Sequence, residues 1–498
     1  MYEARPCEVI QAMKKLHLSL IATIAALLLV STAWGLMMSY ATQDTVPDGT
    51  VVDGVPIGGL QIDQSIEQLE EAWTAFEATE LTITANLTKD KQQTWSLGEL
   101  GFRVNREPIL QAVQSLREGS LLKRARYRFT FPREHRMKLA WNTKQFEARI
   151  RHQWGWLDQS KTADATRRIT AEDKILYYNH REAYRIDMPV LSEHVRSWTA
   201  ELWQQLSTDS SDSDPAADRT ASLKLPIRIV QPELTLQKLK AQGVERKIAW
   251  HTTDYSASPV GRAFNVEATA RTLQDWVLAP GEVFDYDKVI ASAQAQYGFR
   301  EAPVILNGEL VPGIGGGICQ VSSTLYQAAL LAGLEIVERR NHSLPVSYMP
   351  LGQDATFSEG VINFRFRNTT GKHLVIRTET KNRKLTIKLF GTLPSNITYR
   401  ISSNTVKTID PPTREVPSAK ALPGRTVRLT EGKPGYIVET YRTMVRDGKE
   451  VSRERISRDT YKATPHTIGV AGDGISENET TIAPPAEMLL EDGIGLAP

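Results

Sequence analysis

The feature that most constrains this chain is a long uncharged stretch close to its N-terminus. Residues 16–40 contain no Asp, Glu, Lys or Arg, and Arg5, Lys14 and Lys15 precede them. About 20 apolar helical residues cross the hydrocarbon core of a bilayer, and basic residues before such a segment favour a cytoplasmic N-terminus. We therefore predict a cytoplasmic tail over 1–15, a transmembrane anchor over 16–40, and a single-pass cell-membrane protein whose bulk is extracytoplasmic. Cleavage of the segment as a signal sequence is the alternative.

The charge balance excludes one class of partner. The 498 residues include 60 Lys and Arg against 58 Asp and Glu, a net charge of +2. Nucleic-acid binding needs a clustered basic excess, so we predict no nucleic-acid partner. The local run "RARYRFTFPREHRMK", residues 124–138, predicts either a pair of solvated strands or a contact for an anionic polymer.

The two cysteines, Cys7 and Cys319, fall on opposite sides of the membrane in this topology. They cannot pair, and no disulfide framework is predicted. An unpaired thiol in an oxidising extracytoplasmic compartment therefore needs a specific explanation.

The region after the anchor predicts an α+β fold divided into several domains. The segment "FRVN" at residues 102–105 matches "YRID" at residues 184–187, and a helix-like pattern follows each of them. We interpret this match as a two-fold internal repeat of a small α+β unit.

The predicted boundaries follow changes in composition and pattern. A Ser- and Asp-rich stretch and the acidic, proline-punctuated end of the chain are expected to be disordered. The segments are a first repeat over 50–130, a second over 131–235 with disordered 207–222, a central α+β domain over 244–390, a β-rich module over 396–470 and a disordered tail over 473–498.

Cys319 belongs to a glycine-rich motif, "GIGGGICQVSSTLYQAALLAG". The glycines permit close backbone approaches that a Cβ atom would forbid, and the apolar spacing after them predicts a helix with Cys319 in its first turn. The helix dipole there favours a thiolate, and the backbone N–H groups of residues 317–319 could line an oxyanion hole. The residues predicted to bind a ligand are Gly315, Gly316, Gly317, Gln320 and Ser322.

A nucleophilic cysteine needs a base and a group that orients the base. His342 follows a strand-like segment between polar neighbours, and Asp354 comes next along the chain. The order Cys, His, Asp is similar to that of transglutaminase-like and papain-like cysteine enzymes, as an analogy of fold. The catalytic hypothesis is Cys319 as nucleophile, His342 as base and Asp354 as orienter. In the alternative, Cys319 is a small buried residue and His342 is satisfied by local hydrogen bonds.

Other chemistries fit these residues less well. The glycine run lacks the lysine of a phosphate-binding loop, and Ser322 and Ser323 lack a lysine three residues on. One cysteine with one or two histidines is too few ligands for a structural zinc site. We predict no metal and no cofactor.

Several segments together carry a family resemblance. "PGEVFDYDKVI", "YGFREAPVILNGELVPGIGGGICQVSSTLYQAALLAGLEIVERRNHSLPVSYMPLGQDATF" and "FRFRN" resemble the VanW-like family, named from glycopeptide-resistance gene clusters. The two repeats resemble the peptidoglycan-binding domain that commonly precedes it. "EGKPGY" with "DGKEVSRE" resembles the five-glycine (G5) cell-surface module, which is associated with N-acetylglucosamine-containing polymers.

The resemblance implies a bacterial envelope protein whose partner is peptidoglycan or another wall polymer, with glycopeptide resistance as an accessory role. It supplies no established reaction, so both an enzyme and a non-catalytic wall-binding scaffold stay open. The chain departs from the family pattern at "FDYDKV", which replaces Phe-Ser-Phe-Asn, and at Asn363, where an acidic residue is common.

Overall fold

The computed structural model describes residues 6–87, 92–208, 221–306, 309–422, 424–471 and 490–494. The chain divides into two compact units. Unit 1 combines residues 1–163 with 181–232, and unit 2 combines residues 164–180 with 233–498. Both units contain helices together with several small sheets, which confirms the predicted α+β class.

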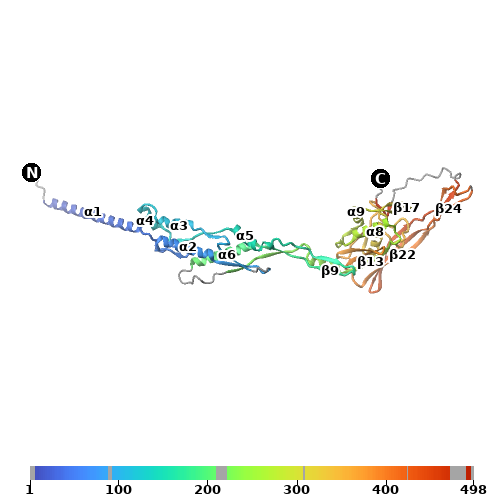
Figure 1. Cartoon of the computed structure of the whole chain (residues 1–498), viewed down its shortest axis with the longest axis horizontal. Coiled ribbons are helices and arrows are strands. Elements are labelled where there is room, and N and C mark those ends of the chain that lie inside the picture. Colours follow the sequence, from blue (N-terminus) through green and yellow to red (C-terminus); the bar gives the residue numbers. More distant parts are fainter. Residues whose placement is uncertain are drawn as a thin grey trace. The chain divides into compact units, whose positions relative to one another are not determined.

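Helix α1, Pro6–Ala41, carries the predicted anchor (Figure 1). Within Ile10–Ala41, the most apolar window of 18 residues has a mean hydropathy of 2.1, and none of that window is buried within the protein. The helix is long and apolar enough to cross a membrane, although a signal sequence near an N-terminus has the same properties.

Unit 1 buries one hydrophobic core between its helices and short strands. Its aromatic members include Trp73, Phe76, Trp95 and Trp154. The elements are β1 Val51–Val52, β2 Val55–Pro56, α2 Ile62–Ala78, β3 Glu80–Thr84, β4 Gln92–Ser96, β5 Phe102–Val104, α3 Glu107–Gln114, α4 Leu121–Thr130, β6 Glu134–His135, β7 Leu139–Trp141, α5 Thr143–Trp154, β10 Ala183–Ile186, α6 Met188–Thr208, β11 Ala221–Lys224 and β12 Ile227–Val230.

The segments of the predicted repeat make similar contacts. Arg103 in β5 and Arg185 in β10 each donate to the backbone carbonyl of the preceding residue, at 2.8 Å and 2.6 Å. The backbone N–H group of the residue that follows each arginine donates to a carboxylate: Val104 donates to Glu77 and Ile186 donates to Asp158.

The basic run at residues 124–138 is not a pair of strands. Its first half lies in helix α4, and only Glu134–His135 forms a short strand. Arg128 is fully buried, and its guanidinium donates to the backbone carbonyls of Gln43 and Thr45. The alternating basic and aromatic residues resemble a strand pattern, but residues 121–130 form a helix whose Arg128 side chain bonds to the chain segment after α1.

In unit 2, residues 244–390 form the central domain around one buried helix, α10. Its elements are β13 Arg246–Asp254, α8 Val260–Leu273, β14 Trp276–Leu278, β15 Val283–Asp285, α9 Tyr286–Tyr297, β16 Glu301–Leu306, β17 Glu309–Ile314, α10 Ile318–Leu331, β18 Glu335–Glu338, β19 Arg365–Arg367, β20 Leu374–Lys381 and β21 Lys384–Gly391. The sheets have the strand orders β13-β21-β20-β14, β15-β19-β18 and β17-β16-β28, where β28 is Leu490–Glu491.

Unit 2 also contains a hairpin from the first half of the chain. Strands β8, Thr166–Ile169, and β9, Ile175–Tyr178, pair with each other. Asp173 in their turn forms ion pairs with Lys247 at 2.6 Å and Lys388 at 2.9 Å. This hairpin lies within the range predicted for the second repeat, 131–235, but the structure groups it with unit 2.

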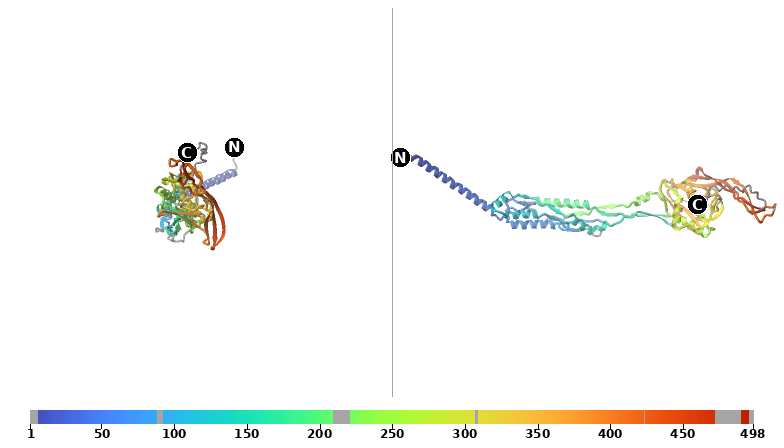
Figure 2. Two further views of the ribbon diagram at one scale, coloured as in Figure 1. Left: turned by 90° about the vertical axis from the view of Figure 1, so that its right-hand side faces the viewer. Right: turned by 90° about the horizontal axis from the view of Figure 1, so that it is seen from above.

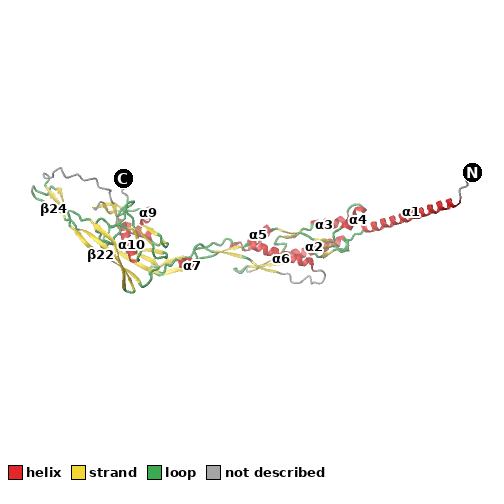
Figure 3. Ribbon diagram, turned by 180° about the vertical axis from the view of Figure 1, so that it is seen from behind, coloured by secondary structure: helices red, strands yellow, loops and turns green. Residues whose placement is uncertain are grey.

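Residues 396–470 form the C-terminal module, which in Figure 3 consists of strands and loops without helices. Strands β22 Ile397–Ile409, β25 Gly435–Arg446 and β26 Lys449–Tyr461 form one sheet, and β23 Thr413–Pro417, β27 His466–Val470 and β24 Val427–Thr430 form another. Figure 2 shows the long strands of the first sheet curving past the yellow central domain. Asp447 and Gly448 form the turn between β25 and β26, with φ of 52° and 76°.

The two segments predicted to be disordered lie largely outside the described residues. At the edges of 207–222, helix α6 extends to Thr208 and β11 begins at Ala221, so those edges are ordered. In the tail, Leu490–Glu491 form strand β28, and the five residues 490–494 are packed on the central domain. For these residues the prediction of disorder is wrong.

Candidate functional site

The start of helix α10 is shaped by glycines. Gly315 and Gly317 have φ of 94° and 110°, a region that other residues rarely adopt. A Cβ atom on Gly316 would lie 2.4 Å from the carbonyl oxygen of Pro303. The glycine run therefore lets the chain turn tightly into a helix whose first residues are fully buried.

Cys319 lies in the first turn of α10, as predicted, and it is completely buried. Its sulfur accepts a hydrogen bond from the backbone N–H of Phe357 at 3.0 Å and lies 3.5 Å from the Phe357 carbonyl oxygen. Burial and then the nearby Asp492 carboxylate raise the pKa of the Cys319 thiol well above its usual value. The expectation that the helix dipole would produce a thiolate is wrong for this state.

His342 and Asp354 form the pair that their order in the sequence suggests. Nδ1 of His342 lies 2.6 Å from Oδ2 of Asp354, and the backbone N–H of His342 donates to the same oxygen at 2.7 Å. Both side chains are buried. Burial alone would lower the pKa of His342, but the hydrogen bond and charge of Asp354 outweigh burial and raise it.

The Asp354 carboxylate is held from the other side by two further residues. Arg339 approaches its Oδ1 at 3.4 Å, and the Tyr461 hydroxyl of the C-terminal module donates to the same oxygen. Burial alone would raise the pKa of Asp354, but the bonds from His342 and the charge of Arg339 prevail and lower it to about 2. The carboxylate is therefore ionised and fixes the ring of His342.

Among the described residues, no hydrogen bond joins the Cys319 thiol to the His342 ring. Instead, Nε2 of His342 lies 3.5 Å from the hydroxyl of Tyr348. The guanidinium carbon of Arg262 lies 5.6 Å from the centre of the Tyr348 ring, and Nη1 of Arg262 donates to Gln320 at 2.7 Å. Tyr348 and Arg262 thus connect the histidine to α10, and no motif in the sequence points to either residue.

The polar side chains predicted to bind a ligand are engaged inside the domain. Gln320 donates to Thr253 at 3.1 Å and to the carbonyl of Asp254 at 3.0 Å. The Ser322 hydroxyl donates to the carbonyl of Ala355 at 2.6 Å. These contacts fix the buried face of α10, and a ligand-binding role for the two residues stays a prediction.

The tail residues 490–494 cover the start of α10. Oδ1 of Asp492 accepts a hydrogen bond from the backbone N–H of Cys319 at 2.7 Å. Glu491 accepts from the backbone N–H and the hydroxyl of Ser343, both at 3.0 Å. A carboxylate thus occupies one N–H group of the predicted oxyanion hole, and Cys319 is closed off from solvent.

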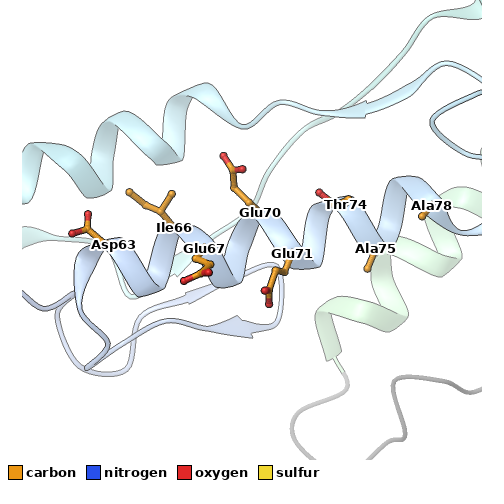
Figure 4. A pocket seen from close by; sticks show the side chains of 8 residues that line it. All are labelled: Asp63, Ile66, Glu67, Glu70, Glu71, Thr74, Ala75 and Ala78. Atoms are coloured by element: carbon orange, nitrogen blue, oxygen red, sulfur yellow. The ribbon is translucent and has the colours of Figure 1, made fainter.

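Other parts of the described chain are weaker candidates for a functional site. Within the described ranges, no group of three or more His, Cys, Asp or Glu side chains is placed to hold a metal ion. A shallow surface runs along helix α2 in unit 1 (Figure 4), and its carboxylates come from Asp63, Glu67, Glu70 and Glu71. A single helix lines that surface, so it does not enclose a ligand.

Comparison with known proteins matches each of the two parts of unit 2 to a protein family. Residues 261–390 match the family model described as VanW like protein, and residues 401–472 match the G5 domain. The C-terminal half of the chain carries a VanW-like domain followed by a G5 domain. The central domain and the C-terminal module are these two domains, and both families are associated with the cell wall.

Two curated relatives match part of the chain. The uncharacterised protein YoaR of Bacillus subtilis is 35% identical over 33% of this chain and 56% of its own length. The vancomycin B-type resistance protein VanW of Enterococcus faecalis is 28% identical over 29% of this chain and 55% of its own. The chain therefore spans about half the length of the curated relatives that it matches.

A solved G5 domain from an IgA1 protease is 27% identical to this chain. The match covers 15% of this chain and 88% of that one, with a TM-score of 0.13.

Proposed function

We propose that this protein is anchored in the cell membrane by α1, faces the wall, associates with peptidoglycan, and acts on wall peptide or amide bonds through Cys319, His342 and Asp354. The observation that carries the proposal is the buried His342–Asp354 pair, whose Asp354 holds Nδ1 and leaves Nε2 as the nitrogen that exchanges a proton. Both domains of unit 2 belong to wall-associated families.

In the proposed reaction, Nε2 of His342 takes the thiol proton while the sulfur bonds to the carbonyl carbon of the peptide. The Cys319 backbone N–H donates to the oxygen that becomes negative. The C–N bond then breaks, and the amine leaves with the proton from His342, so that a thioester remains on Cys319. Water releases an acid from this thioester, whereas an amine forms a new amide. The proposed reaction requires an open state of the site, in which the Cys319 sulfur contacts Nε2 of His342.

The test is turnover of purified peptidoglycan fragments, followed by mass spectrometry. Cys319→Ala should abolish product formation, and His342→Ala should reduce it at least ~100-fold, because a general base contributes about 10²–10⁴-fold. Ser347→Ala, on an exposed side chain of the same loop, is the control and should retain activity. Equal turnover by the wild type and Cys319→Ala would reject the enzyme.

A non-catalytic wall-binding scaffold is the second candidate. It is favoured by the burial of Cys319 and by its hydrogen bonding to Phe357 in place of His342. This function predicts that Cys319→Ala sediments with purified sacculi as well as the wild type does, with no product from either protein.

A further inference from the structure

The surface over Cys319 already holds a peptide, namely residues 490–494 of the chain itself. Leu490 and Glu491 pair antiparallel with Leu306 and Ile305 of β16 and add a third strand to the β16–β17 hairpin. The backbone N–H of Ile494 donates to the carbonyl of Ile314 at 2.9 Å. This is the arrangement by which a sheet edge binds an extended peptide.

Two adjacent carboxylates give the bound segment its chemical character. Glu491 and Asp492 are only 2% and 7% exposed. Burying a carboxylate is unfavourable unless donors meet it, and here Ser343 meets Glu491 while the first turn of α10 meets Asp492. The groove therefore provides a separate donor for each of two neighbouring acidic side chains.

The next position of the segment accepts only a residue without a side chain. A Cβ atom on Gly493 would lie 2.8 Å from Cγ1 of Val304 and 2.9 Å from the carbonyl oxygen of Ile314. On the groove side, a Cβ atom on Gly315 would lie 3.2 Å from the backbone nitrogen of Ile494. Glycines on both sides thus allow the two backbones to approach closely.

We propose that this groove binds extended acidic peptides with a glycine after two carboxylates, and that residues 490–494 occupy it as an intramolecular competitor that closes Cys319. A separate peptide of this chemistry would meet the same donors. Because the tail is tethered, its effective concentration exceeds that of a free ligand at ordinary concentrations. The inference rests on the proposed function only in taking such a peptide as the substrate.

The experiment uses the full chain in detergent micelles with Cys7→Ser, so that Cys319 is the only thiol. The rate of its reaction with a maleimide reports access to the groove. Gly493→Val should displace the tail and raise this rate at least about tenfold, since the tail loses both its packing and its charge-assisted hydrogen bond. Gly155→Val adds the same volume in unit 1, where a new Cβ meets nothing closer than 3.7 Å, and should leave the rate unchanged.

A capped synthetic peptide, Leu-Glu-Asp-Gly-Ile, should suppress labelling of the Gly493→Val chain again. A peptide with Asn in place of Asp should require a roughly tenfold higher concentration for the same suppression of labelling, because it lacks the charge that the helix N-terminus stabilises. Failure of the first peptide to suppress labelling would show that the tail is a fixed strand of the domain and would overturn the proposal.

Asp492→Asn tests the same idea without added volume, in case Gly493→Val does not fold. A fluorescent form of the acidic peptide should bind Asp492→Asn more tightly than the wild type, and equal affinity would contradict the competition. Neither measurement needs turnover. A chain that labels and binds as expected but releases no product keeps the peptide groove and rejects the enzyme.

Discussion

At the scale of single residues, the His342–Asp354 pair shows how burial and charge oppose each other. Burial by itself would drive both groups toward their neutral forms. The short contact between them, with Arg339 beside Asp354, reverses that tendency for both partners. Opposite pKa shifts in one buried pair are typical of groups held for proton transfer, although structural ion pairs produce them too.

The pair should contribute to stability in a defined range of pH. The pKa of Asp354 falls from a usual 3.8 to about 2. A carboxyl group with a lowered pKa stabilises the folded chain above its unfolded pKa, and this contribution is lost as the pH falls through the folded pKa. The raised pKa of His342 acts in the opposite sense, because its contribution is lost as the pH rises through the folded value.

We therefore expect the stability difference between the wild type and Asp354→Asn to shrink by about 1 kcal/mol between pH 6 and pH 3. Urea unfolding followed by tryptophan fluorescence measures this difference. Glu450→Gln, on an exposed side chain of β26, should show no such trend. A difference that is constant with pH would mean that Asp354 is not ionised in the folded chain.

At the scale of elements, the G5 domain supports the candidate site. Its Tyr461 hydroxyl donates to Asp354 and accepts the backbone N–H of Gly352 at 2.6 Å. Arg339 links Asp354 to Asp459 of the same strand at 2.6 Å. The loop that carries the histidine and aspartate is therefore held between the VanW-like domain and strand β26.

Tyr461→Phe should destabilise unit 2 by about 1–3 kcal/mol, because it leaves buried polar groups of Asp354 and Gly352 without a partner. Differential scanning calorimetry measures the loss. Tyr436→Phe is the matched control, since among the described residues its hydroxyl has no hydrogen bond, and it should be nearly neutral. Equal effects of the two substitutions would argue against a supporting role for Tyr461.

Sequence patterns predicted helices and strands well where local residues alone determine the secondary structure. The strand-like segment before His342 forms β18, and the start of α10 was predicted from its glycines. Residues 490–494 were wrongly predicted to be disordered, because their structure depends on contacts with groups distant in the chain, such as Ser343 and the backbone N–H of Cys319. The thiol pKa was misjudged for the same reason, since burial by the folded domain raises it most and the distant Asp492 carboxylate raises it further.

At the scale of the whole molecule, the proposed anchor α1 would set the side of the membrane on which the two units lie. If Lys14 and Lys15 keep the N-terminus in the cytoplasm, replacing both by Glu should lower the fraction of chains whose bulk is outside. Digestion of intact protoplasts by an added protease measures this fraction. The control variant, Lys123→Glu with Lys138→Glu, makes the same change in net charge on the C-terminal side of α1. It should leave the fraction of chains whose bulk is outside unchanged. Equal digestion of all three chains would contradict the orientation.

The hairpin at residues 164–180 also has a consequence for the order of synthesis. Unit 1 needs residues 181–232, which are made after the hairpin, and the hairpin needs Lys247 and Lys388, which are made later still. A growing chain cannot complete either unit by folding strictly from its N-terminus, although domains usually fold in that order. The hairpin therefore lacks its ion pairs to Lys247 and Lys388 while residues 181–232, which complete unit 1, are being synthesised.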